Sequence, residues 1–117
     1  MEQLNRITVR GIVGNVRTSK VSDRTLAQLT VVTNYAYKTP DGSAVLESTW
    51  LRACCWEGKA ISKDDLESLS KGSKVQIEGR LRNQRYTGED GVERSDCEII
   101  ASSLQVFKEG EPLLYQM

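Results

Sequence analysis

The chain has 117 residues, which is enough for one domain with a single modest core. Charged residues make up 27% of it, hydrophobic residues 38%, and no apolar run approaches the roughly 18 residues of a membrane helix. Histidine is absent, so the commonest general base and neutral metal ligand are missing, as is a glycine-rich phosphate loop. We therefore expect a protein that is not an enzyme and uses no cofactor or metal.

The cysteines and the N-terminus bear on the cellular compartment. The first residues lack the apolar stretch of a signal peptide. Three cysteines without paired spacing argue against a disulfide framework and for a reducing compartment. Cys54 and Cys55 would point to opposite faces of a strand, so we interpret them as packing residues. These features predict a cytoplasmic protein with no membrane partner.

The first half of the chain contains three segments with strand-like alternation. The first predicted strand spans residues 4–13, and the polar stretch 15–24 after it is predicted to be a loop. A second strand over 25–37 leads through a strong turn signal at 39–43 into a third strand over 47–56.

The third strand has two contrasting faces. Leu51, Ala53 and Cys55 share one parity, whereas the other parity carries Trp50, Arg52, Cys54 and Trp56. The tryptophans could belong to the core, because tryptophan is highly buried on average. Two large rings flanking an arginine fit a small closed core poorly, so we favour the interpretation in which this face is exposed.

The second half begins with the only predicted helix, over residues 62–70, where Ser62 and Asp65 approximate a capping box. The longest alternating strand follows within residues 71–91. Its apolar parity carries Val75, Ile77, Gly79 and Leu81, and its other parity carries Gln76, Glu78, Arg80, Arg82, Gln84 and Tyr86. Turn residues then lead into a last β-rich run over 92–107.

This order of elements favours a closed sheet. A glycine inside a strand, such as Gly79, suits a tight bend at a barrel corner, and closure removes exposed strand edges. We predict an all-β fold, a five-stranded OB-fold Greek-key barrel with one short helix between its third and fourth strands. The barrel would occupy residues 1–108, and residues 109–117 would form a short, loosely held tail.

The formal net charge is zero, but charge is segregated along the chain. Residues 71–88 contain five basic side chains and one acid, whereas residues 89–98 contain five acids and one arginine. Solvated strand edges would explain this pattern as well as a basic binding face would.

The aromatic residues favour a binding face. Aromatic rings stack on bases with little regard to base identity, and neighbouring cations contact the phosphate backbone. Duplex DNA hides its base faces, so this combination suits unpaired strands. The residues concerned are Tyr37, Trp50, Trp56, Tyr86, Arg52, Arg80 and Arg82.

Residues 71–82, which read KGSKVQIEGRLR, resemble the corresponding stretch of bacterial single-stranded DNA-binding proteins of the OB-fold type. Asn5, Arg6 and Gly11 match the opening strand, and the resemblance spans roughly residues 4–107. It implies base stacking by Tyr37, Trp50, Trp56 and Tyr86, and we add Arg6 to the expected DNA contacts. Tyr37 shares its parity with inward residues, so it requires a strand that twists or extends beyond the barrel.

The resemblance also implies a homotetramer, and the last strand offers a reason for one. Ile100, Leu104 and Val106 have the parity opposite to Ile99 and Ala101. Either a second subunit covers one of these two apolar faces, or a bulge switches the parity.

The leading hypothesis is sequence-tolerant binding and protection of single-stranded DNA in replication, recombination or repair. We expect a variant without the family's flexible linker and acidic tail, which leaves contacts with replication or repair proteins open. A tail-less accessory or interaction protein of a primosome or mobile element is the alternative. A module for tRNA or oligosaccharide is a third hypothesis.

Overall fold

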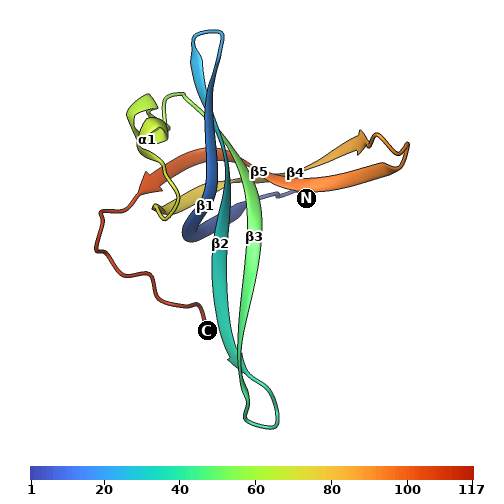
Figure 1. Ribbon diagram of the computed structural model, residues 1–117, viewed down its shortest axis with the longest axis vertical. Helices are drawn as coiled ribbons and strands as arrows, with labels where there is room; N and C mark the ends of the chain where they lie inside the picture. Colours follow the sequence, from blue (N-terminus) through green and yellow to red (C-terminus); the bar gives the residue numbers. More distant parts are fainter.

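The computed structural model describes residues 1–117 and has five strands and one short helix. The strands close into a barrel in the order β1-β2-β3-β5-β4, in which only β3 and β5 pair in parallel (Figure 1). This arrangement confirms the predicted fold. The bounds are β1 Ile7–Val21, β2 Arg24–Lys38, β3 Ala44–Trp56, α1 Lys63–Ser68, β4 Lys74–Thr87 and β5 Glu93–Val106.

β1 bends so that it can pair with two strands. Its first half pairs with β4, and its second half, from Ile12 onward, pairs with β2. The loop predicted over residues 15–24 is wrong, because β1 continues to Val21 and only Ser22 and Asp23 separate it from β2. This end of the β1–β2 hairpin extends beyond the barrel, so no buried face marked it in the sequence.

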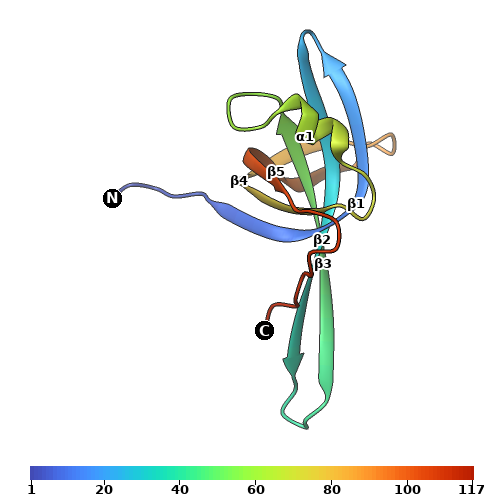
Figure 2. The ribbon, with the colours of Figure 1, turned by 90° about the vertical axis from the view of Figure 1, so that its left-hand side faces the viewer.

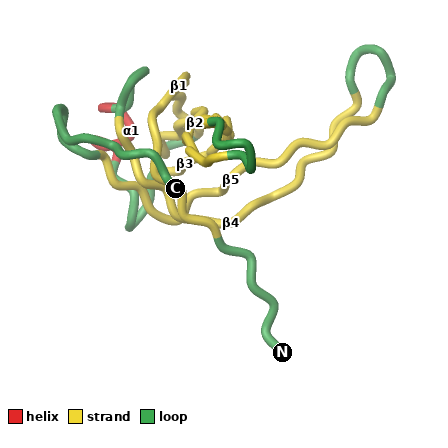
Figure 3. Tube along the Cα trace, turned by 90° about the horizontal axis from the view of Figure 1, so that it is seen from below, coloured by secondary structure: helices red, strands yellow, loops and turns green.

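Two further hairpins also project from the barrel, and they point in different directions (Figures 1 and 3). In the β2–β3 arm, β3 begins at Ala44, three residues earlier than predicted. Its turn is the one expected from the sequence, because the Thr39 amide donates to the Ser43 carbonyl at 2.9 Å and Gly42 has a φ of +88°. The β4–β5 hairpin leaves the barrel near Leu81, which is therefore 37% exposed although its parity is apolar.

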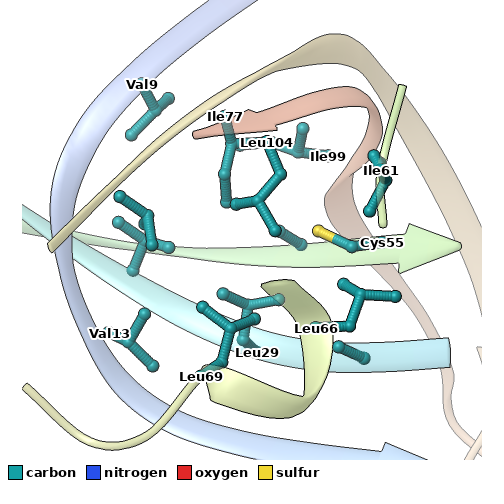
Figure 4. Close-up of a cluster of buried hydrophobic side chains, with 14 residues drawn as sticks. Val9, Val13, Leu29, Cys55, Ile61, Leu66, Leu69, Ile77, Ile99 and Leu104 are labelled. Carbon is teal, nitrogen blue, oxygen red and sulfur yellow. The ribbon is translucent and has the colours of Figure 1, made fainter. Parts of the chain in front are cut away.

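The core is a cluster of fourteen buried side chains contributed by all five strands, α1 and the residues on either side of α1 (Figure 4). β3 contributes Ala53 and Cys55, with Leu51 packed against the cluster, as its parity predicted. Burial raises the pKa of the Cys55 thiol to about 12, which fits a packing role. The side chain of Ser62 caps α1 by accepting from the Asp65 amide at 3.0 Å. No helix is long and apolar enough to cross a bilayer.

A β-bulge explains why β5 carries apolar residues of both parities. Glu78 pairs with Ser103 and Gly79 with Ala101, so Ser102 is an extra residue that switches the parity of the strand. Ile99 and Leu104 consequently both face the core, at 0% and 7% exposed. The bulge explanation is confirmed for Ile99 and Leu104, so the inward position of these two residues needs no second subunit.

The chain after Val106 turns back across the barrel and runs beside β2 (Figures 1 and 2). Gln116 forms a parallel bridge opposite Tyr35, in which the Ala36 amide donates to the Gln116 carbonyl at 2.8 Å. Lys74 Nζ donates to the Glu111 carbonyl at 2.5 Å. The segment that the sequence predicted to be loosely held therefore makes backbone contacts with the β2 edge.

Barrel closure at the β4–β5 contact requires a residue without a side chain. A Cβ at Gly79 would lie 2.1 Å from the Ile100 carbonyl oxygen, so backbone would have to move. We predict that Gly79→Ala lowers the free energy of unfolding by about 1–3 kcal/mol, as overpacking does. Denaturant unfolding followed by circular dichroism measures it. Gly58→Ala is the matched control, because no atom lies within 4 Å of that position. Equal stability of the two variants would contradict this account of closure.

Candidate nucleic-acid interface

The outer face of β3 is the centre of the candidate interface. Its core-facing parity is buried, so Trp50, Arg52 and Trp56 lie on the opposite side of the strand. Trp50 is 62% exposed, whereas Trp56 is half-buried. The interpretation that this face is exposed is therefore confirmed at Trp50 and Arg52, but Cys54 on the same face is only 7% exposed.

Trp56 has a cation beside its ring. The Arg24 guanidinium lies 5.2 Å from the ring centroid and donates to the Glu57 carbonyl through Nε and Nη2 at 3.1 and 2.8 Å. One side of the indole is thus occupied by a guanidinium of fixed orientation. The sequence did not single out Arg24, because it falls at the edge of the segment predicted to be a loop.

Arg52 and Arg82 lie in one row across three strands. Glu98 of β5 pairs with Arg52 of β3 on one side and with Arg82 of β4 on the other. Arg82 Nη2 contacts Glu98 Oε1 at 2.5 Å, and Arg52 forms an ion pair with Asp96. Glu98 is only 7% exposed, so its charge depends on this partner. Asp96 and Glu98, which belong to the acidic segment 89–98, therefore form ion pairs with two of the predicted DNA contacts.

Arg6 and Arg80 are exposed and form no ion pair. They flank one backbone pairing, because Ile7 of β1 is opposite Gly79 of β4. Asn5 anchors the same place by accepting from the Leu81 amide at 3.0 Å and donating to its carbonyl at 2.7 Å. These two arginines are the predicted contacts whose charge no protein carboxylate offsets.

The remaining two predicted stacking residues lie on the arms and not beside Trp50. Tyr37 is 40% exposed near the end of the β2–β3 arm, and Tyr86 is 49% exposed on the β4–β5 hairpin. Tyr37 has the parity of the core residues of β2, and it is exposed because the arm extends beyond the barrel, as its parity required. Tyr35, which the sequence analysis passed over, lies 6.1 Å from Tyr37 between ring centroids. Its position two residues earlier on one strand is the signal that could have identified it.

A shallow groove of about 330 Å³ runs beside this face. Polar side chains from β1, β2, β3 and β5 line it, among them Asn15, Arg17, Thr30, Arg52 and Glu98. Arg17 Nη2 donates to Gln28 Oε1 at 2.9 Å, which places a further cation at the groove. The lining offers hydrogen-bond donors and acceptors beside Arg52 on the outer face of β3.

A larger cavity of about 610 Å³ lies between the C-terminal segment and β1, and none of the predicted contacts lines it. Arg10 is held there over the Phe107 ring at 5.7 Å and donates to Gln76. No group of three or more metal-ligating side chains occurs in the structure. The outer face of β3 carries the exposed Trp50 ring and an arginine paired with a carboxylate.

Comparison with known proteins agrees with this geometry. Residues 4–107 match the family described as "Single-strand binding protein family". The single-stranded DNA-binding protein of Xanthomonas axonopodis pv. citri is 32% identical over 106 residues, which cover 89% of this chain and 58% of the relative. That of Wolinella succinogenes is 34% identical over 86 residues, which cover 74% of this chain and 52% of the relative. The matched region thus spans between half and two thirds of these relatives.

Among solved structures, the fold resembles a chain from "Plasmodium falciparum SSB complex with ssDNA" with a TM-score of 0.80. That match covers 92% of this chain and 98% of the other at 20% sequence identity, so it bears on the fold. The family match extends over the whole barrel, from before β1 to the residue after β5. The chain belongs to the single-strand binding protein family.

Proposed function

We propose that this chain binds and protects single-stranded DNA, without preference for base sequence, during replication, recombination or repair. The observation that carries the proposal is the 62% exposed Trp50 ring on the outer face of β3, two residues from Arg52. The family match supports it, as do relatives that are named single-stranded DNA-binding proteins.

Aromatic stacking and positive charge make separate contributions to DNA binding. A base stacked on an aromatic ring contributes about 1–3 kcal/mol whatever its identity, and this requires an unpaired base. Trp50 and Trp56 would stack bases along β3, and Tyr37 and Tyr86 would extend the track onto the two arms. Because the aromatic side chains contact base faces and not base edges, the binding is sequence-tolerant.

The arginines contribute in two different ways. Arg6 and Arg80 are free to neutralise phosphates directly, which makes binding depend on salt. Arg52 and Arg82 are oriented by Asp96 and Glu98, so a phosphate must compete with these carboxylates. We expect the first two to contribute most of the ionic component.

We further propose that the protein is a homotetramer that acts without catalysis in the cytoplasm. Several copies lengthen the track and raise the effective concentration of each next site. The three free cysteines support a reducing compartment. Exposed apolar residues outside the interface, such as Leu114 and Tyr115, are available for contacts between copies.

The stacking role of Trp50 is tested by Trp50→Ala. Because the ring is largely exposed, we expect little loss of stability but a loss of about 1–3 kcal/mol in binding to a labelled oligo-dT, measured by fluorescence anisotropy. Val92→Ala removes another exposed apolar side chain, which is 51% exposed, and serves as the control. Unchanged affinity, or a large drop in melting temperature, would refute the stacking role. Tighter binding to structured RNA or to an oligosaccharide would redirect the proposal.

The ionic role of Arg6 and Arg80 is tested by changing both to Gln. We expect the slope of log affinity against log salt to flatten by roughly 0.7 for each phosphate of a single strand that the variant no longer neutralises. Lys63→Gln, on α1, is the control for removal of a surface charge, because Lys63 contacts Glu67 away from β3. A slope equal to that of the unaltered protein would place the DNA path elsewhere.

The assembly is tested by light scattering at micromolar concentration without DNA. A homotetramer gives about four times the 13.1 kDa mass of one chain. Obtaining the mass of one chain would contradict the tetramer. A tetramer that fails to bind oligo-dT would instead favour an interaction module.

A further inference from the structure

We propose that Gly14 is a positioning residue for Trp50, whose indole ring rests on the bare backbone of a β-bulge in β1. The inference rests on the proposed function, because it explains how the ring is held ready for a base. Three observations support it: the register of β1, the contacts of Gly14 and the exposure of Trp50.

The bulge is visible in the pairing of β1 with β2. Val13 is opposite Val31, and Asn15 is opposite Thr30, so Gly14 is an extra residue without a partner. The Asn15 amide donates to Thr30 Oγ1 at 3.0 Å, which fixes the bulge to the neighbouring strand. The bulge therefore presents a defined piece of backbone on the outside of the barrel.

The indole reaches this backbone across an intervening strand. Trp50 on β3 is opposite Val32 on β2, which in turn is opposite Ile12 on β1. A Cβ at Gly14 would lie 2.4 Å from Trp50 Cζ3 and 3.3 Å from Cη2. The first distance is shorter than Cβ contacts in proteins, so the ring would have to move to admit a side chain. The six-membered ring of the indole thus occupies the space that any other residue at this position would fill.

The backbone itself does not require glycine here. Gly14 is not among the glycines with positive φ, so alanine could adopt its conformation. What excludes a side chain is the tryptophan ring, together with Thr30 Oγ1 at 3.0 Å. The glycine therefore acts through the position of Trp50.

A supported ring has a functional advantage. Trp50 remains 62% exposed, so the bulge fixes the ring without hiding it. An unsupported exposed tryptophan would sample several rotamers, and ordering it on binding would cost affinity. Contact with the bulge orders the ring before a base arrives.

The test is a double-mutant cycle of Gly14→Ala and Trp50→Ala, with binding to labelled oligo-dT as the readout. We expect Gly14→Ala to weaken binding by at least about fivefold, approaching the effect of losing a stacked ring. In the Trp50→Ala background, the same change should have no further effect. Gly58→Ala, at a position with no atom within 4 Å, should leave binding unchanged.

A second readout needs no DNA. Acrylamide quenching of the Trp50 fluorescence, obtained by subtracting the Trp50→Ala spectrum, should increase when Gly14→Ala displaces the ring. Thr30→Val is a milder variant that removes the acceptor for the Asn15 amide, and it replaces Gly14→Ala if that protein does not fold. We expect it to weaken oligo-dT binding only while Trp50 is present.

The outcomes separate this inference from the proposed function. If Trp50→Ala binds normally, the stacking role itself is wrong, and the role of Gly14 is wrong with it. If Trp50→Ala binds weakly but Gly14→Ala and Thr30→Val bind normally, only the positioning role is overturned. Losses that add up in the double variants would also overturn it, because Gly14 would then act independently of the ring.

Discussion

The candidate interface depends on the burial of one side of β3 in a closed barrel. Ala53 and Cys55 belong to the core cluster. Because successive side chains of a strand point to opposite faces, the residues that alternate with them face outward. Trp50 and Trp56 are exposed to different degrees because β1 and β2 offer each of them a different support. The same alternation of side chains along β3 thus places Ala53 and Cys55 in the core and Trp50 on the outer face.

Two local irregularities in the strands of the barrel determine which side chains face the core. The bulge at Ser102 returns Leu104 to the core after Ile99, and the bulge at Gly14 separates Val13 from Val16, which packs against the same core. An extra residue changes which side chains face inward and leaves a segment of backbone uncovered outside. At Gly14 that uncovered backbone carries the ring of Trp50.

The electrostatic character of the face follows from the neighbours of each arginine more than from the net charge of zero. Asp96 and Glu98 bring carboxylates to the same outer face as Arg52 and Arg82, so part of the positive charge is held within the protein. Such pairs orient the guanidinium groups and reduce their attraction for anions at a distance. The neutral composition is therefore compatible with a face whose cations are arranged for close contact with a phosphate backbone.

The sequence alone determined the five strands, the helix between β3 and β4, the outward parity of Trp50 and the turn at 39–43, because alternation and turn chemistry are local properties. It misjudged the end of β1 and left the second apolar face of β5 undecided, since a ribbon beyond the barrel has no buried face and a bulge leaves no mark in composition. Only the tertiary structure decided which arginines meet a carboxylate and where the rings of Trp50 and Trp56 rest. Those contacts join residues such as Gly14 and Trp50, which are far apart in the chain and meet only when the strands adopt their register.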